Sequence, residues 1–189
     1  MAEVDKLYIE TCPFLDMAKF KAGLRMATTD EKHAERERDV WHVTRLLAAS
    51  RDRVIRVLTS SVTIAECLHL GDPAEPVPNA NTQRFYSELL TSGKSGVNLV
   101  QPIQSILELA RDLRWKRRIF LKPMDSIHVA TALHFRCKEI LTRDGGIYKV
   151  RDQLAQLNLA VVYPSDTALL PAAYTQDDFN ETLRQRSPP

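Results

Sequence analysis

The hydrophobic and polar positions of the chain predict strands and helices in alternation. Short apolar runs, the pattern of buried strands, lie near residues 6–10, 53–58, 97–100, 139–142 and 160–163. Between these runs, apolar residues recur three and four positions apart, which is typical of helices with one buried face. We therefore expect an α/β class, with a three-layer α/β/α arrangement and a mostly parallel central sheet.

Six stretches are predicted to be helical: residues 13–26, 34–49, 62–70, 82–91, 103–113 and 123–135. Pro123 suits the first turn of the last helix, because the missing N–H of proline costs nothing there. That helix is largely apolar on all sides, so we expect it to be buried. The helix at 82–91 is expected on the surface, and Asp16 and Asp152 are expected to be surface charges. Residues 71–81, with three prolines, are expected to form a loop.

One domain accounts for most of the chain. Its 189 residues are 44% hydrophobic, which is enough to bury a sizeable core. We expect the domain to span residues 1–164, followed by a partly ordered C-terminal tail over residues 165–189. No apolar run approaches the roughly 20 residues that cross a membrane, and the first residues lack the features of a signal peptide. A cytoplasmic protein without a membrane partner is therefore expected.

The cysteines and the net charge limit the kinds of site and partner that we expect. Cys12, Cys67 and Cys137 are widely spaced and form no CxxC pair, which argues against a disulfide framework or a zinc site. The net charge of +2 permits a nucleic-acid partner without requiring one. The chain has no glycine-rich phosphate loop, so we do not expect it to use nucleoside triphosphates.

Four acidic residues are predicted to meet at one edge of the sheet. Glu10 ends the first strand, and Asp144 follows the fourth. Glu66 lies in the helix after the second strand, and Asp125 lies in the first turn of the helix that Pro123 begins. Ligands of such sheets bind beyond the carboxyl ends of the strands. Taken alone, each acid has a simpler explanation in helix capping, turn formation or contact with water.

Carboxylates that gather in this way repel one another and raise each other's pKa, unless a cation lies between them. Oxygen ligands suit Mg²⁺ or Mn²⁺, and the sequence offers no set of His and Cys residues for zinc. A cation held by a few carboxylates also accepts phosphate oxygens, so the cluster favours metal-assisted hydrolysis of phosphodiester bonds. His128 lies one helical turn after Asp125 and could face this site, although a buried histidine is more often a hydrogen-bonded core residue.

The motifs that carry these acids resemble the PIN-domain family. They read YIET, SSVTIAEC, MDSIHVATAL and EILTRD, and the resemblance covers roughly residues 4–164. Within the family, the chain looks most like the toxin components of VapBC-type toxin–antitoxin pairs. The resemblance implies an Mg²⁺- or Mn²⁺-dependent endoribonuclease with catalytic acids Glu10, Glu66, Asp125 and Asp144. It also implies that Glu10, Asp125 and Asp144 hold the metal and that Thr142 supports the site.

The resemblance further implies RNA as substrate, a possible cognate antitoxin and a possible homodimer. Five cations are expected to hold the RNA backbone, namely Lys19, Arg25, Arg114, Lys116 and Arg117. One motif departs from the family, which most often has Asp-Thr/Ser-Asn where this chain has Glu10-Thr11-Cys12. A nucleic-acid-binding module with weak or lost catalysis therefore stays open as an alternative. So does a DNA-directed or structure-specific nuclease outside toxin–antitoxin systems.

Overall fold

A single parallel sheet forms the centre of the molecule. The computed structural model describes residues 4–68, 70 and 77–175. Five strands pair in the order β3-β2-β1-β4-β5, and every neighbouring pair is parallel. Their bounds are β1 (Lys6–Ile9), β2 (Arg56–Ser60), β3 (Val97–Val100), β4 (Glu139–Leu141) and β5 (Ala160–Val162). The predicted α/β class and the five predicted strands are confirmed.

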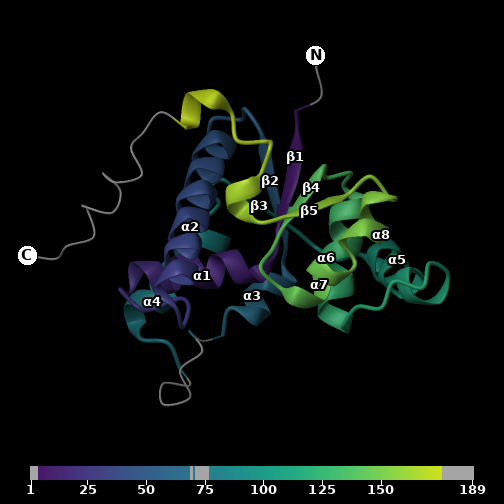
Figure 1. Cartoon of the computed structure of the whole chain (residues 1–189), viewed down its shortest axis with the longest axis horizontal. Coiled ribbons are helices and arrows are strands. Elements are labelled where there is room, and N and C mark those ends of the chain that lie inside the picture. Colours follow the sequence, from purple (N-terminus) through teal and green to yellow (C-terminus); the bar gives the residue numbers. More distant parts are fainter. Residues whose placement is uncertain (1–3, 69, 71–76, 176–189) are drawn as a thin grey trace, which may run out of the picture.

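Helices cover both faces of this sheet, as Figure 1 shows. One layer contains α1 (Thr11–Lys21), α2 (Asp30–Arg51), α4 (Ala80–Tyr86) and the π-helical turn η1 (Ser87–Thr91). The other contains α5 (Gln104–Trp115), α6 (Pro123–His134), α7 (Gly145–Lys149) and α8 (Arg151–Ala155). The short helix α3 (Val62–Glu66) directly follows β2 at the carboxyl end of the sheet. The three-layer arrangement is confirmed, with an all-parallel sheet.

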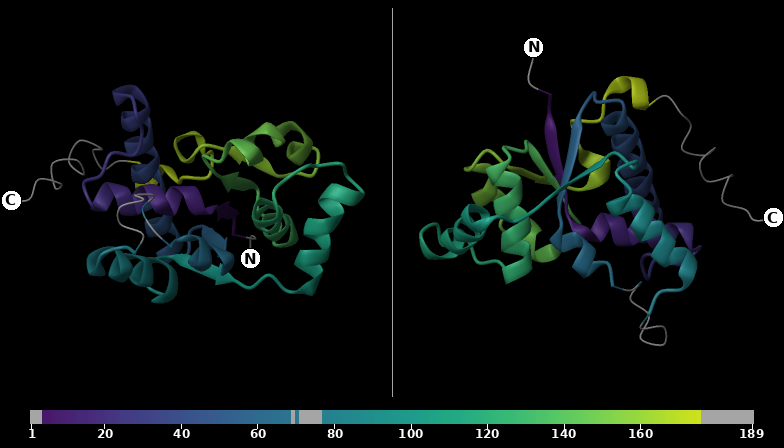
Figure 2. Two further views of the ribbon diagram at one scale, coloured as in Figure 1. Left: turned by 90° about the horizontal axis from the view of Figure 1, so that it is seen from below. Right: turned by 180° about the vertical axis from the view of Figure 1, so that it is seen from behind.

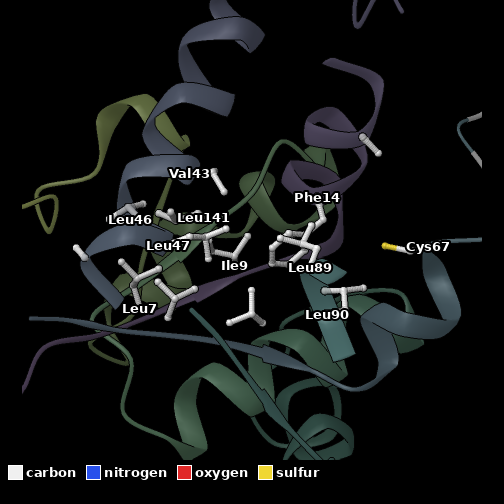
Figure 3. Close-up of a cluster of buried hydrophobic side chains, with 14 of the residues drawn as sticks. Leu7, Ile9, Phe14, Val43, Leu46, Leu47, Cys67, Leu89, Leu90 and Leu141 are labelled. Carbon is white, nitrogen blue, oxygen red and sulfur yellow. The ribbon is translucent and has the colours of Figure 1, made fainter. Parts of the chain in front are cut away.

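The side chains of β1 alternate between the two halves of the core, because successive residues of a strand point to opposite faces. Leu7 and Ile9 pack with Phe14 of α1 and with α2, as Figure 3 shows. Tyr8, between them, belongs to the other cluster, which includes Ile106 of α5 and apolar residues of α6. The central strand is thus buried on both faces, as expected of a parallel sheet covered by helices.

Several predicted boundaries are wrong, each for a local reason. The strand predicted at 53–58 begins at Arg56, because Arg53 has a positive φ of 63° and the Val54 N–H still bonds to the Ala49 carbonyl oxygen. The helix predicted at 13–26 begins earlier, at Thr11, where the Glu10 side chain accepts from the Cys12 N–H. It ends at Lys21, shortly before a glycine with a left-handed φ of 70°.

Two further helices differ from their predicted length, and a third helical stretch differs from its predicted exposure. The helix predicted at 34–49 begins at Asp30, because Thr29 caps a first turn that is polar throughout. The helix predicted at 62–70 ends at Glu66, and residues 69 and 71–76 of the predicted helix and loop lie outside the described residues. The stretch predicted as a surface helix at 82–91 buries three side chains in the core, those of Tyr86, Leu89 and Leu90.

Two acids of the α1–α2 layer are buried in ion pairs. Asp16 was expected to be a surface charge, but it is 3% exposed and accepts a hydrogen bond from Arg36 at 2.5 Å. Asp39 is 2% exposed and accepts from Arg143 at 2.5 Å and from the Ser165 N–H at 3.0 Å. Asp39 therefore ties α2 to the loop after β4. Asp152 is exposed, as predicted.

The segment after β5 crosses back to α2 through two 3₁₀ turns, η2 (Pro164–Asp166) and η3 (Ala172–Tyr174). Figure 2 shows this segment beside α2. Glu139 of β4 accepts from the Thr167 hydroxyl and the Ala168 N–H. The predicted tail thus begins with residues that contact the domain, and its residues 176–189 lie outside the described part. None of the helices in the described ranges has the length and apolar content needed to cross a lipid bilayer.

Replacing Asp39 by alanine should lower the free energy of unfolding by about 3 kcal/mol. The reason is that Arg143, whose side chain is 13% exposed, would lose its closer carboxylate and keep, in the described part of the chain, only the half-exposed Glu35 at 3.6 Å. Chemical denaturation measures the loss. Asp152→Ala removes an acid whose side chain is 86% exposed and should change stability by less than about 0.5 kcal/mol. If the two variants lost equal stability, Asp39 would not anchor this loop.

Candidate functional site

The candidate site lies where the order of the strands reverses. From β1 the chain moves outward through β2 to β3, and it then returns to place β4 on the other side of β1. Ligands of parallel sheets bind beyond the carboxyl ends of the strands at such a reversal. The Glu10 N–H bonds to the Leu141 carbonyl oxygen at 3.1 Å, so the chain segments that carry Glu10 and Asp144 leave the sheet side by side.

Glu10 is the most deeply buried of the four acids, at 5% exposure. Its Oε2 accepts from the Thr142 hydroxyl and from the Cys12 N–H, each at 3.0 Å. Burial raises the pKa of Glu10, although the nearby His128 and these hydrogen bonds act in the opposite direction. The Thr142 hydroxyl also accepts from the Asp144 N–H at 2.9 Å. One threonine hydroxyl therefore joins the two acidic segments.

Glu66 ends α3 and is held by two side chains from other elements. Its Oε2 accepts from the Thr11 hydroxyl at 2.5 Å and lies 2.6 Å from Nε2 of His128. Burial alone would raise the pKa of Glu66, but the hydrogen bonds from His128 and Thr11 outweigh it and leave the pKa lowered. The expected mutual rise in pKa is therefore not found at Glu66.

A buried hydrogen-bonded chain stands behind Glu66. His128 is 1% exposed, and its Nδ1 lies 2.7 Å from the Tyr8 hydroxyl. That hydroxyl accepts the Ser60 N–H at 2.8 Å. Each of these groups has a partner when Tyr8 donates to Nδ1 and Nε2 donates to Glu66. His128 is thus a hydrogen-bonded core residue that orients an acid of the site.

Asp144 and Asp125 converge near Gly146. Asp144 caps α7, and its Oδ1 accepts from the N–H groups of Gly146 and Ile147 at 2.6 and 3.1 Å. A Cβ placed on Gly146 would lie 2.8 Å from this oxygen and 3.4 Å from Oδ2 of Asp125. The glycine therefore leaves room for both carboxyl groups.

Asp125 differs from the other three acids. Within the described residues, its Oδ2 is buried and has no hydrogen-bond partner. Burial raises the pKa of Asp125, and the charges of Asp144 and Glu66 raise it further. The repulsion between acids that the sequence predicts is therefore found here. A buried carboxylate oxygen without a partner costs free energy unless a proton or a cation neutralises it.

This donor set fits a hard divalent cation. Glu10, Asp125 and Asp144 offer carboxylate oxygens, the ligands that Mg²⁺ and Mn²⁺ prefer. In the described ranges, no three His, Cys, Asp or Glu side chains are already placed as ligands of one ion. The fit therefore depends on the unpaired oxygen of Asp125 and on the repulsion between the acids, and not on a preformed ligand shell.

The five cations predicted to bind RNA lie in two separate places. Arg114, Lys116 and Arg117 lie at the end of α5, whereas Lys19 and Arg25 belong to the α1 side of the sheet. The Arg25 guanidinium bonds to the carbonyl oxygens of Ala27 and Thr28 and to Asp30 in its own loop. The structure therefore does not bring the five cations together.

Three supporting residues escaped the sequence analysis. Tyr8 lies two positions before Glu10 on β1, and the period of two of a strand could have placed it on the same face. Thr11 follows Glu10 directly and stands at the Thr/Ser position of the first motif, but it was given no role there. Arg143 packs its guanidinium 3.9 Å from the ring centroid of Tyr163, which stacks on Tyr148. Arg143 also donates to Asp39, so the residue directly before Asp144 is held in place.

A comparison with protein-family models matches residues 22–153 to the PIN domain. The matched range includes Glu66, Asp125 and Asp144 and begins after Glu10. No curated protein matches the chain.

Replacing Tyr8 by phenylalanine should destabilise the protein by about 1–3 kcal/mol, because the Ser60 N–H and Nδ1 of His128 would both lose their buried partner. Thermal or chemical denaturation measures the change. Tyr86→Phe is a matched control, since the Tyr86 hydroxyl is buried without a partner in the described ranges and its removal should cost little. A Tyr8 variant as stable as the control would contradict the hydrogen-bonded chain.

Replacing Asp125 by asparagine should stabilise the protein in chelator at about pH 7.5. The raised pKa of Asp125 means that its charged form destabilises the fold, a penalty that disappears as the pH falls through the raised pKa toward the unfolded value of about 4. We expect a gain of about 1 kcal/mol, or about 2–4 °C in Tm, that shrinks at low pH.

Asp144→Asn is the control for this prediction. Asparagine can keep the cap on α7, and Asp144 already has two backbone partners, so no comparable gain is expected. Thermal melting across a pH series measures both variants. A stabilisation at Asp144 that exceeds the one at Asp125 would contradict the assignment of the unpaired charge.

Proposed function

Because the chain belongs to the PIN-domain family, whose members are generally nucleases, we propose that it is an Mg²⁺- or Mn²⁺-dependent endoribonuclease. The observation that carries the proposal is the convergence of Asp125 and Asp144, with Oδ2 of Asp125 buried and unpaired in the described part of the chain. A cation bound there would supply the partner that Oδ2 of Asp125 lacks and would offset the repulsion between the two acids. The proposed biological role is that of the toxin in a toxin–antitoxin pair.

The four acids have different proposed roles, which follow from how each side chain is held. Glu10, Asp125 and Asp144 would hold the cation through oxygen. When bound, such a cation lowers the pKa of a water molecule and neutralises charge that develops on the phosphate oxygens. Glu66, whose side chain is 26% exposed, keeps its charge at neutral pH because His128 and Thr11 lower its pKa. It can therefore orient an attacking water beside the scissile phosphate.

The hydrogen bonds of Glu10 support an active nuclease over a binding module. The altered motif lacks the asparagine amide that the family most often has after the first acid, because Cys12 stands there. In this chain the Cys12 N–H and the Thr142 hydroxyl both bond to Glu10, so the acid stays oriented without that amide. The altered motif therefore does not by itself argue against catalysis.

RNA is the proposed substrate, and DNA is the alternative. The cations Arg114, Lys116 and Arg117 at the end of α5 support a polyanionic ligand of either kind. The toxin role adds three further proposals, namely a cognate antitoxin, a homodimer and a cytoplasmic location. A small antitoxin-like reading frame just upstream of the gene would support this role.

The protein should cleave bulk RNA when Mn²⁺ or Mg²⁺ is present and should lose this activity in chelator. Asp125→Asn should reduce the rate by at least about 100-fold, since even residues that only support metal ligands contribute 10- to 100-fold. Gel analysis of RNA cleavage measures the loss, and single-stranded DNA of the same sequence tests the alternative. Asp152→Asn, an exposed change away from the cluster, is the control and should cleave at the normal rate.

A second measurement separates loss of metal from loss of chemistry. Mg²⁺ should raise the Tm of the unmodified protein modestly by mass action, and Asp125→Asn should abolish this shift. An unchanged shift in the variant would mean that the cation binds elsewhere.

A further inference from the structure

We propose that the end of α5 and the segment after it, residues 111–122, form a stacking platform for the unpaired bases of a single strand. We call this segment the α5 platform. It deepens the proposed function, which supplies RNA as the strand, and assigns a substrate preference to a surface outside the acidic cluster.

Two large aromatic rings of the α5 platform face solvent. Trp115 is 65% exposed and Phe120 is 60% exposed. Arg111 lies 4.9 Å from the ring centroid of Trp115, and Arg114 lies 5.2 Å from that of Phe120. Single exposed apolar residues are ordinary on protein surfaces. Two exposed rings, each beside a guanidinium group, are a typical arrangement for stacking bases, because bases stack on aromatic rings and on arginine planes alike.

The charge of the α5 platform fits a polyanion. The platform holds one acid, Asp112, and six exposed cations: Arg111, Arg114, Lys116, Arg117, Arg118 and Lys122. Asp112 lies 2.6 Å from Lys116 and 3.5 Å from Arg111, so its charge is already compensated. The helix dipole favours cations within the last turn of α5, but Arg117, Arg118 and Lys122 lie beyond it. A second copy of the chain would place like charges against one another, so the charge favours nucleic acid over a homodimer on this surface.

A groove lies between the α5 platform and the start of α6, the helix that carries Asp125. It has a volume of about 330 Å³ and runs between α5 and α6, which lie side by side in Figures 1 and 2. Arg114 and Trp115 line one side, and Pro123 and Ser126 at the start of α6 line the other. Phe120 precedes Asp125 by five residues, so their Cα atoms are at most about 18 Å apart.

This placement predicts a preference for single strands. A strand whose bases stack on Trp115 and Phe120 has a phosphate a few nucleotides away that can reach Asp125, because the Cα atoms of Phe120 and Asp125 are at most about 18 Å apart. A duplex cannot use the rings in the same way, because both faces of its interior bases are already covered by neighbouring bases. The cations would still attract a duplex, so the rings and not the charges should separate the two ligands.

Binding to a fluorescein-labelled oligouridylate tests this proposal. The probe has about 12 nucleotides, within the usual range of single-strand site sizes, and a duplex RNA of equal length is the comparison. The full chain carries Asp125→Asn and is kept in chelator, so that no cleavage occurs. Trp115→Ala and Phe120→Ala should each weaken single-strand binding by about 10-fold or more and leave duplex binding unchanged. Trp115→Phe should restore most of the affinity.

Two controls separate stacking from charge. Arg117→Gln should weaken single-strand and duplex binding alike and reduce the salt dependence of binding, whereas Trp115→Ala should leave the salt dependence unchanged. The chain has two tryptophans, of which Trp41 is 9% exposed, so emission quenched by the oligonucleotide reports mainly on Trp115. Trp115→Phe should remove that quenching while binding persists.

The outcomes also separate the α5 platform from the proposed function. Equal weakening of single-strand and duplex binding by Trp115→Ala would overturn the platform, and so would unchanged affinity in both aromatic variants. A dimer that Trp115→Ala dissociates would overturn it as well, because the rings would then be covered by a second copy. Equal affinity for single-stranded DNA would support the platform and count against RNA as the preferred target. Tight single-strand binding by a chain that never cleaves RNA would support the platform and refute the nuclease.

Discussion

The parallel pairing of β1 with β4 is the interaction on which both the sheet and the candidate site depend. It joins Leu7 to Glu139 and Ile9 to Leu141, residues that are more than half the chain apart in sequence. The strand order reverses at this pair, and ligands of parallel sheets bind beyond the carboxyl ends of the strands at such a point. The Thr142 hydroxyl then ties Glu10 to the Asp144 segment across the same pair. Without this pairing, the first and last acids of the cluster would have no common place.

The four acids show how a protein can concentrate negative charge and still fold. Glu10, Glu66 and Asp144 each accept two hydrogen bonds, so most of the repulsion is offset by donors supplied by the fold. Asp125 alone has a buried oxygen without a partner in the described residues, and its pKa is raised. Burial also raises the pKa of Glu10, but of the four acids only Asp125 combines a raised pKa with a buried oxygen that lacks a hydrogen-bond partner among the described residues. Natural proteins commonly trade stability for function at such positions.

The two helical layers serve the site in different ways. The α1–α2 layer holds the loops rigidly, since Asp39 anchors Arg143 beside Asp144, and Thr11 of α1 holds Glu66. The α5–α6 layer supplies Asp125 and His128, and it carries the exposed cations and rings of the α5 platform. A site at the junction of a rigid layer and a charged, accessible layer suits an enzyme that acts on a long polyanionic chain.

The sequence by itself determined the class of fold and predicted which acids lie at the carboxyl ends of the strands. Five apolar runs specified five strands, because a strand covered on both faces must be apolar throughout. The acids that follow or flank these strands could be placed at one edge from chain order alone. Tertiary structure decided how each acid is held. The partners of Glu66, Asp16 and Asp39 come from distant segments, so no local pattern could reveal them. The lack of a hydrogen-bond partner at Oδ2 of Asp125 also depends on the tertiary structure. It arises only because the packed neighbours exclude water from this oxygen and offer it no donor.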